Sequence, residues 1–203
     1  MAVNSVTTRT DPELEPPGAG IPPLEAWWFR VVGFGMVGPL VPWDLARRWF
    51  RREGEAVLKL TPGLPEDVLH RRVLIPRFPG IEDSSRHWSP AMTLAHLIIV
   101  SDAIAEIVVR LGRGERIGAP VRIEDVKPDQ QIPDTVIADY SAMLDRFDRR
   151  MAEEVRNRKS TIRHAHPWVG PLTASQWLKL AAVHQRVHRR QIRSILRIGA
   201  RSE

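Results

Sequence analysis

WLKLAAVHQRVHRRQI, residues 177–192, is the stretch that decides the fold. At about 100° per residue, a helix places the apolar side chains of this stretch and both of its histidines, His184 and His188, within about 80° of one direction. The arginines fall on the opposite side. The pattern therefore predicts an amphipathic helix whose histidines face a core and whose arginines face water.

His184 and His188 lie four residues apart, which on a helix puts them one turn apart on the same face. Two imidazoles at this spacing can direct nitrogens at one metal ion, as in helical H-x-x-x-H sites. The alternative is a pair of core histidines bonded to neighbouring polar groups, because a buried imidazole without a partner costs about 1–3 kcal/mol. A third ligand elsewhere in the chain decides between the two interpretations.

Residues 89–111 supply that third histidine. Ser89 and Pro90 are typical of a helix N-cap and first helical position, and Gly112 ends the pattern. His96 shares an apolar face of this helix with Ile99. Three inward-facing histidines from two helices suit a first-row divalent metal, and they leave coordination positions open for water or substrate, as catalytic sites do.

The remaining periodic segments predict an all-α helix bundle. Amphipathic helices are expected at 43–60 and 134–157, a short helix at 65–72, and a last helix at 173–198 that begins with a T-x-x-Q capping box. Residues 73–87 are expected to be an extended connection, and 112–133 and 158–172 to be loops. The long connections after the first two long helices allow a topology other than up-down-up-down.

The first 42 residues do not share the pattern of the bundle. Residues 1–23 are expected to form a flexible arm without the features of a signal peptide. Residues 24–42 are strongly apolar, but they carry Arg30 and three glycines and are too short to span a membrane. We expect this segment to pack on the bundle, residues 43–203, or on a second subunit. An interfacial anchor through Trp27, Trp28 and Phe29 is the alternative.

The composition of the chain excludes several classes of functional site. The chain has 203 residues, no cysteine and a net charge of +6. Without cysteine there are no disulfides, thiolate metal sites or cysteine nucleophiles, and a cytoplasmic location is expected. The arginines are mixed with acidic residues, and no basic run is interleaved with aromatics. We therefore expect neither nucleic acid nor membrane as a partner.

Two motifs carry a resemblance to a known family. The run WSPAMTLAHL, residues 88–97, is similar to the W-S-x-x-x-x-L-x-H-L entry into the second helix of the DinB/YfiT-like superfamily. The run HPWVGPLTASQW, residues 166–177, continued to His184 and His188, resembles its H-P-x-x-G-x-L-T-x-x-x-W … H-x-x-x-H signature. The similarity covers roughly residues 43–198, so the apolar segment 24–42 is an addition to the family core.

The resemblance implies a four-helix bundle, often dimeric, with a metal held by His96, His184 and His188. Members with known activity include metal-dependent hydrolases and thiol-dependent S-transferases and isomerases. Zn or Ni is expected first, with Mn or Fe as further options. The expected partners are a small-molecule substrate, including a low-molecular-weight thiol, and a second copy of the chain.

The function expected from the sequence is that of a metal-dependent enzyme in which a three-histidine site activates water or a thiol. The alternative is a non-catalytic binding or assembly module with structurally buried histidines. Two further residues are candidates for roles near the site. Glu106 is a candidate acceptor for an imidazole N–H, and Gln191 is a candidate for contact with substrate or with the metal site.

Overall fold

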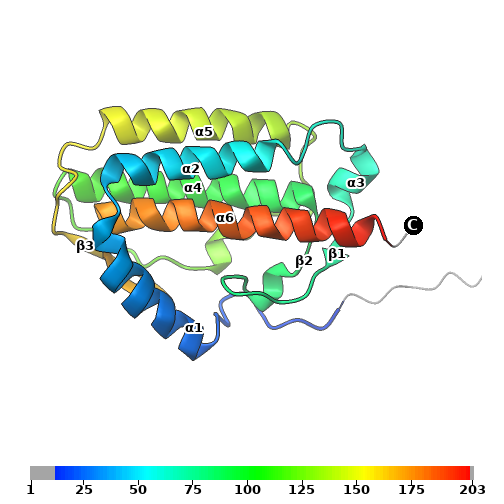
Figure 1. Ribbon diagram of the computed structural model, residues 1–203, viewed down its shortest axis with the longest axis horizontal. Helices are drawn as coiled ribbons and strands as arrows, with labels where there is room; N and C mark the ends of the chain where they lie inside the picture. Colours follow the sequence, from blue (N-terminus) through cyan, green and yellow to red (C-terminus); the bar gives the residue numbers. More distant parts are fainter. Residues whose placement is uncertain (1–11, 202–203) are drawn as a thin grey trace, which may run out of the picture.

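The computed structural model describes residues 12–201, and four long helices dominate it (Figure 1). The predicted all-α four-helix bundle is confirmed. The helices begin and end within a few residues of the predicted bounds, as α2 (Trp43–Leu58), α4 (Pro90–Gly112), α5 (Val136–Glu153) and α6 (Ala174–Gly199).

Shorter elements connect and cover the bundle. The N-terminal segment forms α1 (Pro23–Trp28), a π-helix (Phe29–Val37) and a 3₁₀ turn (Gly38–Leu40). The connection from α2 to α4 contains α3 (Glu66–His70), the strand β1 (Val73–Leu74), a 3₁₀ turn (Asp83–Ser85) and β2 (His87–Trp88), and a further 3₁₀ turn (Glu124–Val126) follows α4. β1 and β2 pair antiparallel.

The prediction of a loop at 158–172 is wrong in part. Residues Arg163–His166 (β3) and Gly170–Thr173 (β4) pair as an antiparallel hairpin that leads into α6. Each strand has only four residues, and Pro171 lies within the second. Short length and an internal proline are typical of turns, so the local sequence predicts a loop here. The indole N–H of Trp177 donates to the carbonyl of His164 at 3.2 Å and fixes the hairpin on the last helix.

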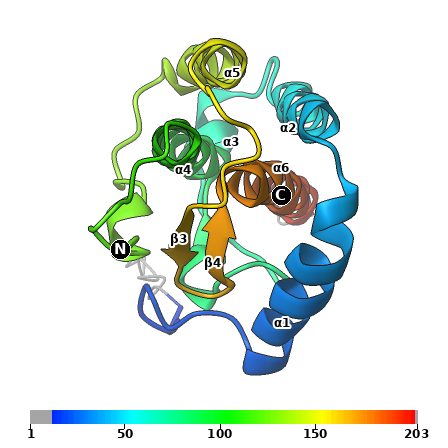
Figure 2. The same ribbon diagram turned by 90° about the vertical axis from the view of Figure 1, so that its left-hand side faces the viewer.

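The helices run in two parallel pairs. Arg146 binds Asp102 and Arg150 binds Glu106, so numbering rises together along α5 and α4, which are parallel neighbours. α2 lies antiparallel to α5. Arg47 of α2 binds Asp148 of α5, and Arg51, which is later in α2, binds Asp145, which is earlier in α5. Figure 2 shows α2 and α4 at opposite corners of the bundle, each in contact with α5 and α6.

Parallel neighbours require a connection that travels the length of a helix. α4 has 23 residues and is therefore about 35 Å long. Residues 113–135 cover that distance, and the 3₁₀ turn within them lies against α4. This crossing brings backbone groups of the loop to the second turn of α4, where His96 lies.

Among the described residues, α4 is the one helix that is long and apolar enough to cross a membrane. Its apolar surface extends around most of the helix, and 56% of its most apolar window is buried inside the protein. It packs against α5 and α6, so the bundle core accounts for its composition.

The described part of the predicted arm, residues 12–22, lies over the connection that follows β1. Glu82 accepts hydrogen bonds from the backbone N–H groups of Gly18 and Gly20 at 2.8 and 3.3 Å, and Asp83 accepts one from Glu15 at 3.0 Å. Residues 1–11 of the predicted arm lie outside the described residues. The segment that follows, α1 and the π-helix, stands beside α6 (Figure 2).

Candidate metal centre

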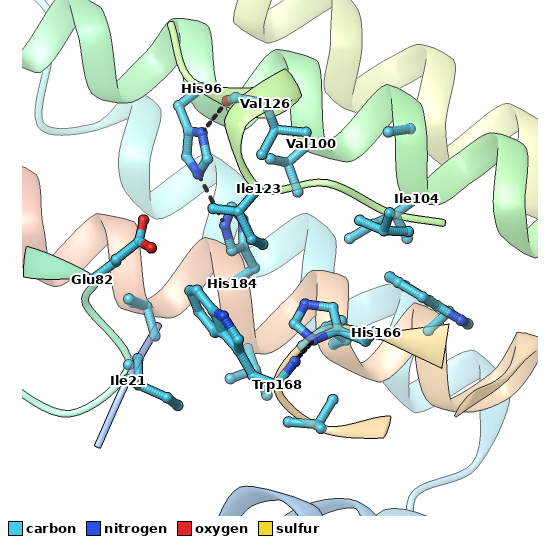
Figure 3. Close-up of a pocket in the computed structure, with 18 of the residues that line it drawn as sticks. Ile21, Glu82, His96, Val100, Ile104, Ile123, Val126, His166, Trp168 and His184 are labelled. Carbon is cyan, nitrogen blue, oxygen red and sulfur yellow. Dashed lines mark hydrogen bonds between the residues drawn. The ribbon is translucent and has the colours of Figure 1, made fainter. Parts of the chain in front are cut away.

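The structure brings together the three histidines that the sequence singled out. His96 extends from α4 and His184 and His188 from the antiparallel α6. Nε2 of His184 lies 3.2 Å from Nε2 of His96 and 3.1 Å from Nε2 of His188. One ligand atom from each residue lies within 4.8 Å of the others. Figure 3 shows His96 and His184 meeting across the space between the two helices.

Hydrogen bonds on the far side of two rings fix their tautomers. Nδ1 of His96 donates to the backbone carbonyl of Val126 at 2.7 Å, and Nδ1 of His188 donates to Oε1 of Gln191 at 2.6 Å. A neutral imidazole that carries its proton on Nδ1 has a lone pair on Nε2. His96 and His188 therefore both direct lone pairs at His184, as metal-binding histidines do when a carbonyl holds the other nitrogen.

This donor set fits a divalent cation. His184 can donate one N–H at most from Nε2, so it can satisfy only one of the two lone pairs that face it. A buried contact between two lone pairs is repulsive unless a proton or metal ion lies between them. With Zn–N bonds of about 2.0–2.1 Å, tetrahedral ligand nitrogens lie about 3.3 Å apart, close to the 3.1 and 3.2 Å observed.

The charge state of the rings also suits a metal. Burial lowers the pKa of His188 to about 4, and burial together with the neighbouring imidazoles lowers the pKa of His96 and of His184 well below the ordinary value of 6.5. All three rings are therefore neutral at pH 7. The neutral imidazole is the form that coordinates metal ions.

Of the two accessory candidates, one lies at the site and one does not. Gln191 is fully buried, and while it accepts from His188 its amide donates to the carbonyl of Ser85 at 2.7 Å. Glu106 faces α5 instead, where its carboxylate accepts from Arg150 at 2.8 Å. The expectation that Glu106 binds an imidazole is corrected: its side chain leaves α4 on the face that pairs with the parallel helix.

Two supporting groups could not be predicted from side-chain patterns. One is the Val126 carbonyl, because a backbone acceptor in a loop leaves no signal in the sequence. The other is Lys127, whose ammonium binds Glu82 and also donates to Oγ of Ser84 and Ser85 at 2.8 and 3.0 Å. This ion pair holds the loop that carries Val126 against the segment that carries Ser85.

The three histidines line a cavity of about 290 Å³. Its walls are mainly apolar and come from α4, α6, the crossing loop and the hairpin. The N-terminal segment supplies Ile21, Phe29 and Phe34. The addition to the family core therefore shapes the cavity. A space of this size with few polar groups suits a small, largely apolar molecule.

His166 is a further polar group in the cavity wall (Figure 3). It directly precedes Pro167, and its Nδ1 accepts the backbone N–H of Trp168 at 3.2 Å. The ring proton therefore lies on Nε2, which has no hydrogen-bond partner within residues 12–201. Burial lowers the pKa of His166 to about 4. At pH 7 His166 is thus a neutral N–H donor at the cavity surface, outside the three-histidine cluster.

A protein family and a solved structure are similar to this chain. The model of the DinB superfamily matches residues 49–192, a range that includes all three histidines. The crystal structure of TT2238, a four-helix bundle protein, is 22% identical; the alignment covers 75% of this chain and 98% of that one, with a TM-score of 0.49. No curated protein matches the chain. Because the family model matches most of the chain's length, the chain belongs to the DinB superfamily.

Proposed function

We propose that this protein is a divalent-metal-dependent enzyme that acts on a small molecule through His96, His184 and His188. The observation that supports the proposal is the convergence of three Nε2 atoms at the wall of a mainly apolar cavity. A divalent ion held by three imidazoles supplies Lewis acidity, which polarises a substrate oxygen and makes water or a thiol more acidic. Hydrolysis and thiol-dependent S-transfer are the two reaction classes proposed.

The chain's own groups then bind and orient the substrate. Apolar side chains such as Val100 and Ile104 contact its carbon skeleton and exclude water. The N–H on Nε2 of His166 donates a hydrogen bond to an acceptor on the substrate. Gln191 and the Val126 carbonyl keep the imidazoles of His188 and His96 in the coordinating orientation.

Zn or Ni is the proposed ion, because three imidazoles without a carboxylate favour these borderline metals over Mn or Fe. We further propose a cytoplasmic location, a homodimer and, for the transferase reaction, a low-molecular-weight thiol as co-substrate. The alternative function is a helical binding or assembly module in which the histidines are structural. It is favoured by the burial of His96 and His188, which are only 6% and 4% exposed.

Elemental analysis separates the two functions. Protein purified without an affinity tag, stripped with a chelator and dialysed against Zn or Ni, is expected to retain about one ion per chain. The variant His184→Ala/His188→Ala is expected to retain almost none. His164→Ala is the matched control, because this histidine is also buried but lies outside the cluster, and it is expected to retain the ion.

Activity assays then test the reaction class. Loaded protein is assayed with ester and amide substrates, and with electrophiles in the presence of a thiol. Turnover that is lost on stripping and restored on reloading supports the enzyme. Metal content near zero in all three proteins, with histidine substitutions changing only thermal stability, would establish the structural alternative.

A further inference from the structure

A second and larger cavity lies on the other side of α6 from the histidines. Its volume is about 660 Å³, and it runs between α6 and the N-terminal segment. Phe29, Phe34, Val183 and Val187 line both cavities, so one layer of apolar side chains separates them. None of the three histidines contacts this second cavity.

Positive charge lines the α6 side of this cavity, which we name the basic groove. Lys179, Arg186, Arg190 and Arg193 follow one another at intervals of seven, four and three residues, which places them on one face of the helix. A fifth cation, Arg189, is neutralised by Glu53 at 2.9 Å. No aspartate or glutamate lines the groove within residues 12–201.

Lys179 is the strongest indication of a ligand. It is only 6% exposed, yet its ammonium has no hydrogen bond or ion pair within the described part of the chain. Burial lowers its pKa, with no neighbouring carboxylate to oppose the shift. Most of the Lys179 side chain is thus removed from water, while the groove offers its ammonium no carboxylate, and an anion bound in the groove would supply the missing negative charge.

The opposite wall is apolar and aromatic. Trp28, Val37 and Val41 from the N-terminal segment and Trp49 from α2 line it, and Arg190 lies over the ring of Phe78 at 4.4 Å. Trp28 and Val37 remain 51% and 50% exposed. The groove thus pairs a row of cations with a hydrophobic wall along one length.

We propose that the basic groove binds an amphiphilic anion, with a carboxylate or phosphate head at Lys179 and Arg186 and an alkyl chain or ring along the wall that contains Trp28 and Trp49. A second copy of this chain fits the surface less well. A two-fold contact centred on the groove would bring its unpaired cations against their own copies. The proposed ligand supplies both missing elements, a negative charge and an apolar body.

Calorimetric titration with short amphiphiles below their micelle concentrations tests the proposal. Decanoate and decyl phosphate are expected to bind saturably with one site per chain. Inorganic phosphate and acetate carry the head without the chain, and decyltrimethylammonium carries the chain with the opposite charge. Each of these three is expected to bind at least about tenfold more weakly, since losing either interaction removes on the order of 1.4 kcal/mol or more.

Variants assign the binding to the groove. Lys179→Met keeps the length of the side chain, and Arg186→Gln changes an exposed residue; each is expected to weaken decanoate binding about tenfold or more. Arg197→Gln is the matched control, because it removes a charge from the same helix outside the groove, and it should leave binding unchanged. Binding should also survive in His184→Ala/His188→Ala, so the result does not depend on the metal.

Four results would overturn the proposal. They are the absence of saturable binding by both anionic amphiphiles, equal binding of the cationic amphiphile, equal weakening by Arg197→Gln, and binding to vesicles of anionic lipid without binding of the monomeric amphiphiles. The last result would assign the surface to a membrane instead.

Discussion

At the scale of the residue, the candidate site depends on which nitrogen of each ring carries the proton. The sequence predicted that His96, His184 and His188 share a core, because helical spacing fixes the direction of each side chain. It could not predict the partners of the far nitrogens. The Val126 carbonyl reaches His96 from a loop, and Gln191 was one inward-facing residue among several until its bonds to His188 and Ser85 were seen.

Gln191 gives the first prediction. Gln191→Met removes the acceptor from Nδ1 of His188 with little change in volume, and we expect metal affinity to fall about 10–100-fold. Gln191→Glu restores an acceptor and should recover most of that loss. Competition with a chromogenic chelator measures both affinities, with thermal unfolding as the check on folding. Equal affinity of the Met variant and the wild type would contradict the tautomer argument.

The buried imidazoles give a prediction for the metal-free protein. The pKa of His188 is about 4 when folded and about 6.5 when unfolded, so the unfolded chain takes up the proton first. Stability is therefore complete above about pH 6.5 and is lost as the pH falls towards 4. At about 1.4 kcal/mol per pKa unit, His188 alone accounts for about 3 kcal/mol.

Urea unfolding of chelator-treated protein at several values between pH 7.5 and pH 4.5 checks this. The midpoint should fall steadily over that range, and the fall should be smaller in His188→Gln. A midpoint that stays constant from pH 7.5 to pH 4.5 would be incompatible with buried neutral histidines.

At the scale of the element, the long helices were predictable and the short pieces were not. A 3.6-residue period over 16 or more residues leaves little ambiguity, whereas β3 and β4 have four residues each and draw their pairing from each other. The π-helix Phe29–Val37 was also missed as such. It contains Gly33 and Gly35, and the N–H of Gly38 donates to the carbonyl of Gly33, a spacing that helix propensity does not encode.

The start of α6 gives a prediction at this scale. Oγ1 of Thr173 accepts the backbone N–H of Gln176, and the Gln176 side chain accepts the N–H of Thr173 at 3.0 Å. Thr173→Ala should lower the free energy of unfolding by about 1 kcal/mol. Thr135→Ala is the control, because Thr135 precedes α5 without a capping bond and its hydroxyl makes only an exposed hydrogen bond to Asp139, and its effect should stay within about 0.5 kcal/mol. Equal losses in urea unfolding would argue against the capping box.

At the scale of the whole molecule, the site depends on the relative directions of the helices and on the long connection that they require. α4 and α5 are parallel, so residues 113–135 must return along the bundle, and this return carries Val126 and Lys127 to His96. The sequence indicated long connections but not which helices are neighbours. Sequence periodicity shows which face of a helix is buried and not what covers it.

The ion pair of Lys127 with Glu82 joins the crossing loop to the connection that also holds residues 18–20. Lys127→Met leaves the Glu82 carboxylate, only 3% exposed, without its cation. We expect a loss of about 3–5 kcal/mol in the free energy of unfolding. Arg146→Met, which breaks a pair about 40% exposed on both sides, should cost about 0–1 kcal/mol. Similar costs in urea unfolding would show that the loop is held by other contacts.

The central claim is that three imidazoles from two antiparallel helices hold one metal ion. Crystals grown with Zn or Ni and measured at the absorption edge of that metal test it most directly. The account predicts one anomalous peak per chain, about 2.0–2.2 Å from Nε2 of His96, His184 and His188. No peak at saturating metal, or a peak bound only by other residues, would contradict it.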